Sequence, residues 1–123
     1  MHIKRIYITC PVRSITEAEK TFLDSYVAGL EKEGYQVHYP PRDTPQEDTH
    51  GIHICRCNNN AIVQADEVHI YWNPTSQGSK FDFGMVFALN KPVLLINRSE
   101  VKPTDHKSFE NVLIALDDNY RQK

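Results

Sequence analysis

The sequence NPTSQGSKFDFG occupies residues 73–84 of this chain. One apolar run, Val68–Trp72, precedes it, and a second, Met85–Leu89, follows it. This arrangement predicts a loop that leaves a buried strand and opens a helix. In α/β proteins, turns of this kind lie at the edge of the sheet where small molecules bind. The stretch therefore predicts both the class of fold and the place of a site.

Strands and helices alternate along the rest of the chain. Strands are predicted over residues 3–9, 35–39, 68–72 and 92–96, and helices from the capping-box pattern at 14–17 to Gly34 and over 49–65, 80–90 and 108–121. The polar stretch 42–48 is predicted to be a loop that covers a site. Because such alternation implies right-handed βαβ crossovers, we expect one α/β domain over residues 1–123, with a parallel sheet of four to five strands and helices on both faces.

The spacing of apolar residues predicts which helix faces turn toward the sheet. In the first helix, apolar residues recur at every fourth position, and Leu23 and Val27 widen the stripe. The recurring residues are Ala18, Phe22, Tyr26 and Leu30. In the last helix, the residues expected to face inward are Val112, Ile114, Ala115 and Leu116.

The composition is that of a globular protein, with 40% hydrophobic and 24% charged residues and a formal net charge of −2. The charges are interspersed, which argues against a nucleic acid polymer or an anionic membrane as partner. No apolar run approaches the roughly 20 residues of a membrane span, and no signal peptide is evident, so we expect a cytoplasmic protein. Three cysteines, an odd number, argue against a disulfide framework.

Candidate binding residues follow the predicted strands, because ligands of parallel sheets bind outside the carboxyl ends of the strands. They are Cys10–Arg13, Asn73–Ser79 and Asn97–Arg98. The first N–H groups of a helix and nearby hydroxyls can hold an anion.

Ser76, Gly78 and Ser79 are residue types suited to holding such an anion. Arg13 beside Ser76 would complete a phosphate-sized pocket, since a guanidinium group matches phosphate oxygens. Asp82, on the first turn of the helix, is expected to point into the same crevice.

Five motifs together resemble the nucleoside 2-deoxyribosyltransferase family, and within it the 2′-deoxynucleoside 5′-monophosphate N-glycosidases. The resemblance runs from Ile6 to about Tyr120. The motifs are Ile6–Tyr7 followed by Arg13, Gln64–Val68, Ser76–Gly78, Phe81–Gly84 and Ala88–Val93.

The resemblance implies a flavodoxin-like, Rossmann-like three-layer fold that forms a homodimer or larger oligomer. It also implies action on the N-glycosidic bond of a small nucleoside or nucleotide, without a metal or other cofactor. By position, Asp82 corresponds to the catalytic nucleophile and Tyr7 to the tyrosine beside it. Ser76 and Arg13 correspond to residues that bind the 5′-phosphate.

Two positions depart from the family pattern. Asp82 replaces a glutamate that is longer by one methylene, and Asn58 replaces an aspartate that handles the proton on the base. Because breaking a glycosidic bond ordinarily uses two carboxyl groups, these changes support binding better than turnover. An acid from the covering loop is an alternative source of the missing proton, and the candidates are Asp43, Glu47 and Asp48.

Three functions therefore remain open. The first is hydrolysis of a nucleoside 5′-monophosphate to free base and sugar phosphate. The second is nucleotide binding or regulation with little or no catalysis, and the third is deoxyribosyl transfer between bases.

Several of these residues also have purely structural interpretations. Asp82 suits the first turn of a helix for dipole reasons, Ser76 and Gly78 are ordinary turn residues, and Arg13 can be a solvated surface charge. Tyr7 in a central strand is typical of a core residue. Trp72 either lines a base pocket by stacking or belongs to the core.

A group of possible metal ligands lies in the predicted helix over 49–65. On a helix, His50, His53 and Cys57 share one face and could hold zinc. Their spacing matches no familiar zinc module. The alternative is a helix turned partly to solvent.

Overall fold

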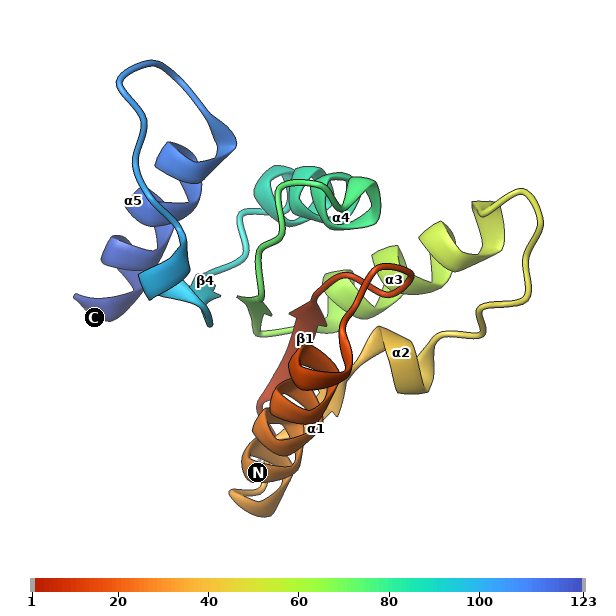
Figure 1. Ribbon diagram of the computed structural model, residues 1–123. Coiled ribbons are helices and arrows are strands. Elements are labelled where there is room, and N and C mark those ends of the chain that lie inside the picture. The colour runs from red at the N-terminus through yellow and green to blue at the C-terminus, as the bar shows by residue number, and fades with distance from the viewer. Residues whose placement is uncertain (1, 123) are drawn as a thin grey trace.

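The computed structural model describes residues 2–122 and contains a parallel four-stranded sheet with the order β2-β1-β3-β4 (Figure 1). The strands are β1 (Arg5–Thr9), β2 (Gln36–His38), β3 (Glu67–Ile70) and β4 (Val93–Leu95). The helices are α1 (Glu17–Lys32), α2 (Pro40–Asp43), α3 (Ile52–Gln64), α4 (Gln77–Ala88), the 3₁₀ turn η1 (Arg98–Glu100) and α5 (Phe109–Arg121).

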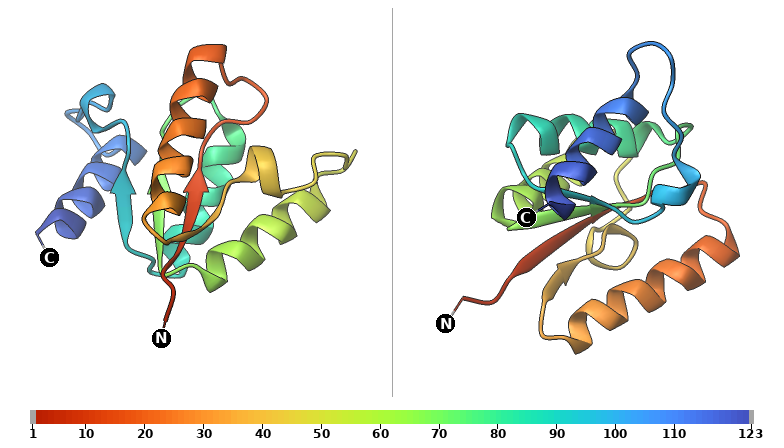
Figure 2. Two further views of the ribbon diagram at one scale, coloured as in Figure 1. Left: turned by 90° about the horizontal axis from the view of Figure 1, so that it is seen from below. Right: turned by 90° about the vertical axis from the view of Figure 1, so that its left-hand side faces the viewer.

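Helices cover both faces of the sheet, as the alternation of strands and helices predicts. Helix α1 lies on one face, and α3 and α4 lie on the other (Figure 2). Helix α5 packs along the edge strand β4. In register, Tyr7 of β1 pairs with His38 of β2 and with Val68 of β3. The expected α/β class, parallel sheet and layered architecture are confirmed.

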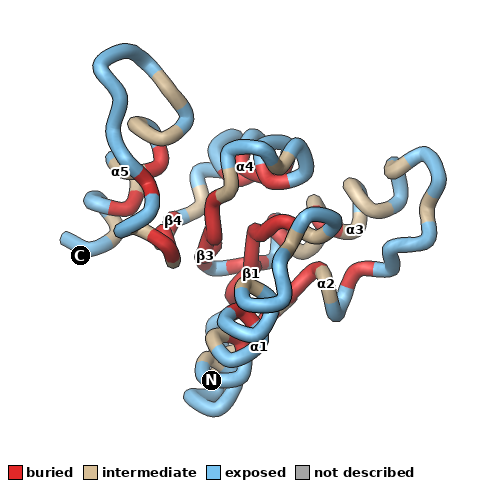
Figure 3. Tube along the Cα trace, viewed as in Figure 1, coloured by how far each residue is buried: buried red, intermediate tan, exposed pale blue. Residues whose placement is uncertain are grey.

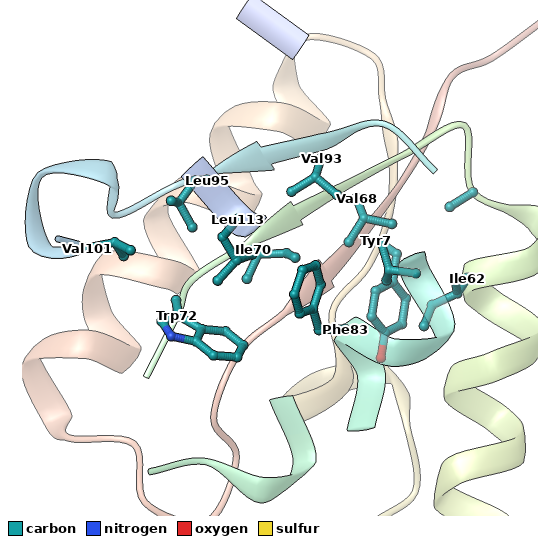
Figure 4. Close-up of a cluster of buried hydrophobic side chains, with 12 residues drawn as sticks. Tyr7, Ile62, Val68, Ile70, Trp72, Phe83, Val93, Leu95, Val101 and Leu113 are labelled. Carbon is teal, nitrogen blue, oxygen red and sulfur yellow. The ribbon is translucent and has the colours of Figure 1, made fainter. Parts of the chain in front are cut away.

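The sheet separates two hydrophobic clusters, and the buried residues gather along the strands and on the inner sides of the helices (Figure 3). Successive residues of a strand point to opposite faces, so Ile6 and Ile8 join the α1 cluster whereas Tyr7 joins the α3–α4 cluster. Figure 4 shows the second cluster, in which the Tyr7 ring lies between Ile62 and Phe83. Among the helices of the described residues, none combines the length and apolar character needed to cross a membrane.

The predicted face of α1 is partly wrong. Leu23 and Val27 are its buried residues, whereas Phe22 is 49% exposed and Ala18 is exposed. The centre of the apolar stripe is therefore shifted by one residue, since Leu23 and Val27 meet the side chains of β1. The capping box is formed by Thr16 and Glu19, not by the 14–17 pattern.

Other differences concern helix starts and faces. The stretch 42–48, predicted as a loop, is helical at its first two residues, because the one-turn helix α2 begins at Pro40, a residue favoured at the first helical position. Helix α4 begins at Gln77 rather than at residue 80, because Ser76 caps it.

In α5 the fully buried apolar residue is Leu113, which the apolar spacing did not identify. Ile114 and Leu116 are partly buried against the core, whereas Val112 and Ala115 are exposed. The prediction for the α5 face is therefore only partly correct.

Asp117 of α5 completes the hydrogen bonding of the edge strand. Its carboxylate accepts from the backbone N–H of Leu95 at 2.7 Å and from Arg98 and Arg121, and the Asp117 side chain has no exposed surface. Arg121 in turn donates to the Leu95 carbonyl at 3.3 Å. Burial alone would raise the pKa of Asp117, but its hydrogen bonds outweigh burial and lower it. Its contribution to stability is therefore present above its ordinary pKa and is lost as the pH falls.

Replacing Asp117 with alanine is expected to lower the free energy of unfolding by about 3 kcal/mol, because the Leu95 N–H and two guanidinium groups lose a buried acceptor. Urea denaturation at pH 7 measures this change. Asp118→Ala is the matched control, since this exposed carboxylate pairs with Arg98 at the surface. Its effect should stay within about 0.5 kcal/mol. Equal losses in the two variants would contradict the role assigned to Asp117.

Candidate functional site

The candidate site lies at the carboxyl end of the sheet, where the strand order reverses between β1 and β3. From this point the chain leaves β1 toward α1 on one face and leaves β3 toward α4 on the other. Such a reversal leaves a crevice between the two connections. Most of the residues predicted to bind a ligand belong to these two connections or to the helix that follows the second. Asn97 and Arg98 follow β4 instead, where Asn97 bonds to the Trp72 backbone and Arg98 pairs with Asp117.

A buried hydrogen bond between Tyr7 and Asp82 joins the sheet to α4. The Tyr7 hydroxyl donates to Asp82 Oδ2 at 2.7 Å, and the two residues are 0% and 7% exposed. Burial raises the pKa of Asp82 to about 6, although the Tyr7 hydrogen bond lowers it. Burial, with the nearby Asp82 charge, also raises the pKa of Tyr7 well above its ordinary value. Near neutral pH the pair is thus a tyrosine hydroxyl bound to a largely ionised carboxylate.

The start of α4 determines why Asp82 faces the sheet. With Ser76 as N-cap, the helix buries Ser79, Asp82, Phe83 and Val86. These positions follow the three- and four-residue spacing of one helix face. Asp82 is therefore a buried residue in the middle of an apolar face, and not a solvent-exposed carboxylate that merely favours a helix end.

Two serines lie at the beginning of α4. Ser76 Oγ accepts from the Ser79 backbone N–H at 3.2 Å. Ser79 is 1% exposed, and its own hydroxyl has no hydrogen-bond partner among the described residues. Gly78 is exposed on the first turn. Asn73 stabilises the preceding loop by accepting from the Thr75 N–H and hydroxyl at 2.9 and 2.8 Å.

The two remaining predicted binding residues have different surroundings. Arg13 is exposed in the loop after β1 and makes no hydrogen bond or ion pair within residues 2–122. Trp72 is 4% exposed, and its indole N–H donates to Glu110 at 2.7 Å. Its ring packs edge-on against Phe83 and Phe109. Of the two interpretations of Trp72, the geometry favours a core aromatic.

Asn58 lies on α3 and is 8% exposed. Its Oδ1 accepts from the Thr44 hydroxyl at 2.7 Å, and Thr44 Oγ1 lies 2.8 Å from His38 Nε2. The His38 ring stacks on Tyr7 with centroids 5.5 Å apart. His38 and Thr44 were not identified from the sequence, because no local spacing connects a strand end, a loop and a helix.

Two acids that were candidate proton donors have structural partners. Asp43 accepts from the Tyr39 N–H at 2.9 Å and pairs with Arg42. Asp48 accepts from the Ile54 N–H at 3.0 Å and thereby holds the start of α3. Glu47 is exposed in the same loop.

The possible zinc ligands do not form a cluster. Within the part of the chain that the structure describes, no three His, Cys, Asp or Glu side chains are arranged to hold a metal ion. The three cysteines are free thiols, and Cys10 is the buried one.

A cavity of about 520 Å³ lies away from these residues. It is formed at the amino ends of the strands, around Lys4, Glu67 and Tyr120. None of the predicted site residues lines it.

Comparisons with solved structures show relatives with the same fold. The fold resembles that of a 2-deoxyribosyltransferase from Bacillus psychrosaccharolyticus, with a TM-score of 0.61, 17% identity, and coverage of 91% of this chain and 95% of that chain. It also resembles the Clostridium botulinum CMP N-glycosidase BcmB, with a TM-score of 0.58, 20% identity, and coverage of 75% of this chain and 70% of that chain. A conserved protein from Enterococcus faecalis V583 superposes with a TM-score of 0.67 and 14% identity over 96% of this chain and 88% of that chain.

A search of curated proteins finds no match. The family model described as nucleoside 2-deoxyribosyltransferase, however, matches residues 6–113, which is most of the chain. The protein therefore belongs to the nucleoside 2-deoxyribosyltransferase family.

Proposed function

We propose that this protein hydrolyses the N-glycosidic bond of a nucleoside or deoxynucleoside 5′-monophosphate and releases free base and sugar phosphate. The observation that carries the proposal is the buried Tyr7–Asp82 pair at the carboxyl end of the sheet. A carboxylate held in an apolar face is costly and is typical of a catalytic group. The family includes proteins named as N-glycosidases and as deoxyribosyltransferases, which agrees with chemistry at this bond.

In the proposed reaction, an oxygen of Asp82 attacks C1′ of the sugar. The bond between C1′ and the base nitrogen breaks, and its electron pair leaves with the base, which takes up a proton. Water then attacks C1′ and displaces the Asp82 carboxylate, so the enzyme is restored. Tyr7 holds the carboxylate in place through the 2.7 Å hydrogen bond.

The start of α4 supports a phosphate on the substrate. Ser76 accepts a hydrogen bond through its oxygen, so its own hydroxyl hydrogen is available to a ligand. Ser79 offers a second hydroxyl, buried and without a partner. An anion at this helix start would be favoured by the helix dipole, and the exposed Arg13 adds positive charge at the same end of the sheet.

A binding protein without turnover is the alternative, and Asn58 is the observation that favours it. An amide cannot donate a proton as a carboxylic acid does. Transfer of the sugar to a second base is a further alternative, because the family includes transferases. We rank transfer below hydrolysis because the start of α4 is suited to phosphate.

We also propose that the protein acts in the cytoplasm as a homodimer or larger homo-oligomer. Support comes from α4, whose outer surface carries Phe81 and Phe87 at 56% and 57% exposure. Exposed aromatic residues on one helix are common at interfaces between subunits.

Incubation with a panel of ribo- and deoxyribonucleoside 5′-monophosphates and their nucleosides is the direct test. We expect chromatography to detect free base from at least one monophosphate. Asp82→Asn should reduce turnover by at least about 100-fold, because the attacking carboxylate is lost. If the parent releases no base but a nucleotide raises its melting temperature, the binding alternative is correct. Release only when a second base is supplied would indicate transfer.

The same variant carries a control for folding. Because the pKa of folded Asp82 is raised to about 6, its ionisation costs stability as the pH rises through that value. An amide avoids this cost. Asp82→Asn should therefore melt at the same temperature as the parent or higher at pH 8, and a lower melting temperature would mean that lost activity reflects misfolding.

The pH dependence of kcat/KM should report the titration of Asp82. Only the ionised carboxylate can attack, so kcat/KM is expected to rise with pH through an apparent pKa of about 6 and then to level off. Tyr7→Phe removes the hydrogen bond that lowers this pKa, so the rise should move upward by about one pH unit. A rise that stays in place in Tyr7→Phe would show that another group titrates.

Replacing Ser79 with alanine should separate phosphate binding from folding. We expect KM for the monophosphate to rise about 10-fold and KM for the corresponding nucleoside to change by less than about twofold, because only the phosphate contact is lost. The melting temperature should not fall, since the buried hydroxyl has no partner to lose. Ser25→Ala, at an exposed position of α1, is the control. Equal changes in KM for both substrates would contradict a phosphate contact.

A further inference from the structure

Three polar side chains from separate elements form a hydrogen-bonded chain beside the Tyr7–Asp82 pair. His38 ends β2, Thr44 follows α2, and Asn58 lies in the middle of α3. Thr44 Oγ1 lies 2.8 Å from His38 Nε2 and 2.7 Å from Asn58 Oδ1. Thr44 is 3% exposed and Asn58 is 8% exposed, so the chain is largely shielded from water.

The direction of these hydrogen bonds follows from the single hydrogen of the Thr44 hydroxyl. Since that hydrogen is donated to Asn58 Oδ1, Thr44 must accept from His38, whose Nε2 therefore carries a proton. Burial lowers the pKa of His38, with Asp43 raising it and Arg42 lowering it, so the ring is neutral near pH 7. The proton on Nε2 thus marks a neutral tautomer.

The chain also fixes the orientation of the Asn58 amide. Its oxygen is occupied by Thr44, and its NH2 group has no hydrogen-bond partner within residues 2–122. This NH2 nitrogen is not fully buried, so it retains contact with solvent. Asn58 therefore offers the two N–H donors of its NH2 group to a ligand, and its oxygen is already occupied.

Asn58 is close to the reacting centre. Thr44 joins it to His38, whose ring stacks on Tyr7 with the ring planes only 9° apart, and Tyr7 donates to Asp82. Helices α3 and α4, which carry Asn58 and Asp82, pack against each other on the same face of the sheet. A substrate whose sugar lies at Asp82 would therefore have α3 as a neighbouring element.

We propose that His38 and Thr44 are positioning residues that hold the Asn58 amide as a neutral donor toward the leaving base. The proposal rests on the proposed N-glycosidase function and names its specificity: a base that presents a carbonyl oxygen or ring nitrogen toward α3. When the bond to C1′ breaks, the electron pair moves onto the base, and the Asn58 NH2 group stabilises the charge on that acceptor. Water then supplies the proton, so no acid on the protein is consumed.

Nuclear magnetic resonance of the ¹⁵N-labelled protein tests the chain without any substrate. The His38 ring should be the neutral tautomer with hydrogen on Nε2, and Thr44→Val should disturb both this signal and the Asn58 side-chain amide signals. Thr44→Ser, which keeps the hydroxyl, should retain both. A hydrogen on Nδ1 in the parent would reverse the donor direction and overturn the proposal.

Kinetics on the best monophosphate of the panel tests the consequence. Thr44→Val should lower kcat about 10-fold with little change in KM, because a misplaced amide gives less stabilisation to the charge that develops on the base during bond breaking. Thr44→Ser should recover most of the lost kcat. Asn58→Asp should make kcat/KM fall as the new carboxylic acid ionises, a fall that the parent lacks. Equal losses in Thr44→Val and Thr44→Ser, or an unchanged pH profile in Asn58→Asp, would overturn the proposal.

Failure of the proposed function gives a different pattern. If the tautomer is as expected but the parent releases no base, hydrolysis is wrong, and nucleotide-induced melting shifts then test base recognition. Thr44→Val should reduce the shift caused by a nucleoside 5′-monophosphate, and Thr44→Ser should retain it. If no monophosphate shifts the melting temperature of the parent, recognition of a base by Asn58 is overturned as well.

Discussion

The hydrogen bond between Tyr7 and Asp82 is the constraint on which the site depends. It connects the central strand β1 to the buried face of α4, which also carries Phe83 and Val86. The pKa of Asp82 rises from 3.8 to about 6 as a result of burial. A shift of about two units corresponds to about 3 kcal/mol of stability given up when the carboxylate is ionised. The Tyr7 hydroxyl offsets part of this cost. Because it is poorly solvated, the carboxylate is also a more reactive nucleophile.

The position of this carboxylate follows from where α4 begins. Ser76 caps the helix, so the buried face passes through Ser79 and Asp82 together. One helix start therefore fixes two different features, the proposed anion-binding end and a buried acid three residues beyond Ser79. A residue added or deleted between Ser79 and Asp82 would separate the two, because each helical residue turns the following side chains by about 100°.

The sequence predicted the order of strands and helices because each strand is a short apolar run bounded by proline, glycine or a charged turn. It did not predict the exact faces of α1 and α5. In both, apolar residues occupy more positions than one face can hold, and only contact with the sheet selects Leu23 over Phe22 and Leu113 over Val112. The strand-to-helix pattern predicted Asp82 as a site residue, and resemblance to a family added Tyr7 and Asn58 as candidates. His38 and Thr44 could not be found in this way, since their relation to Asn58 exists only in three dimensions.

The edge of the sheet at β4 has a consequence for assembly. An edge strand normally offers free N–H and C=O groups with which a strand from another molecule can pair. At Leu95 both groups are already occupied by Asp117 and Arg121 of α5. The sheet therefore cannot be extended through this residue into a continuous sheet across two molecules. Copies of this protein could therefore not join their sheets at this point of β4, and among the described strands only β2, at the other edge, leaves a strand side uncovered by such contacts to α5.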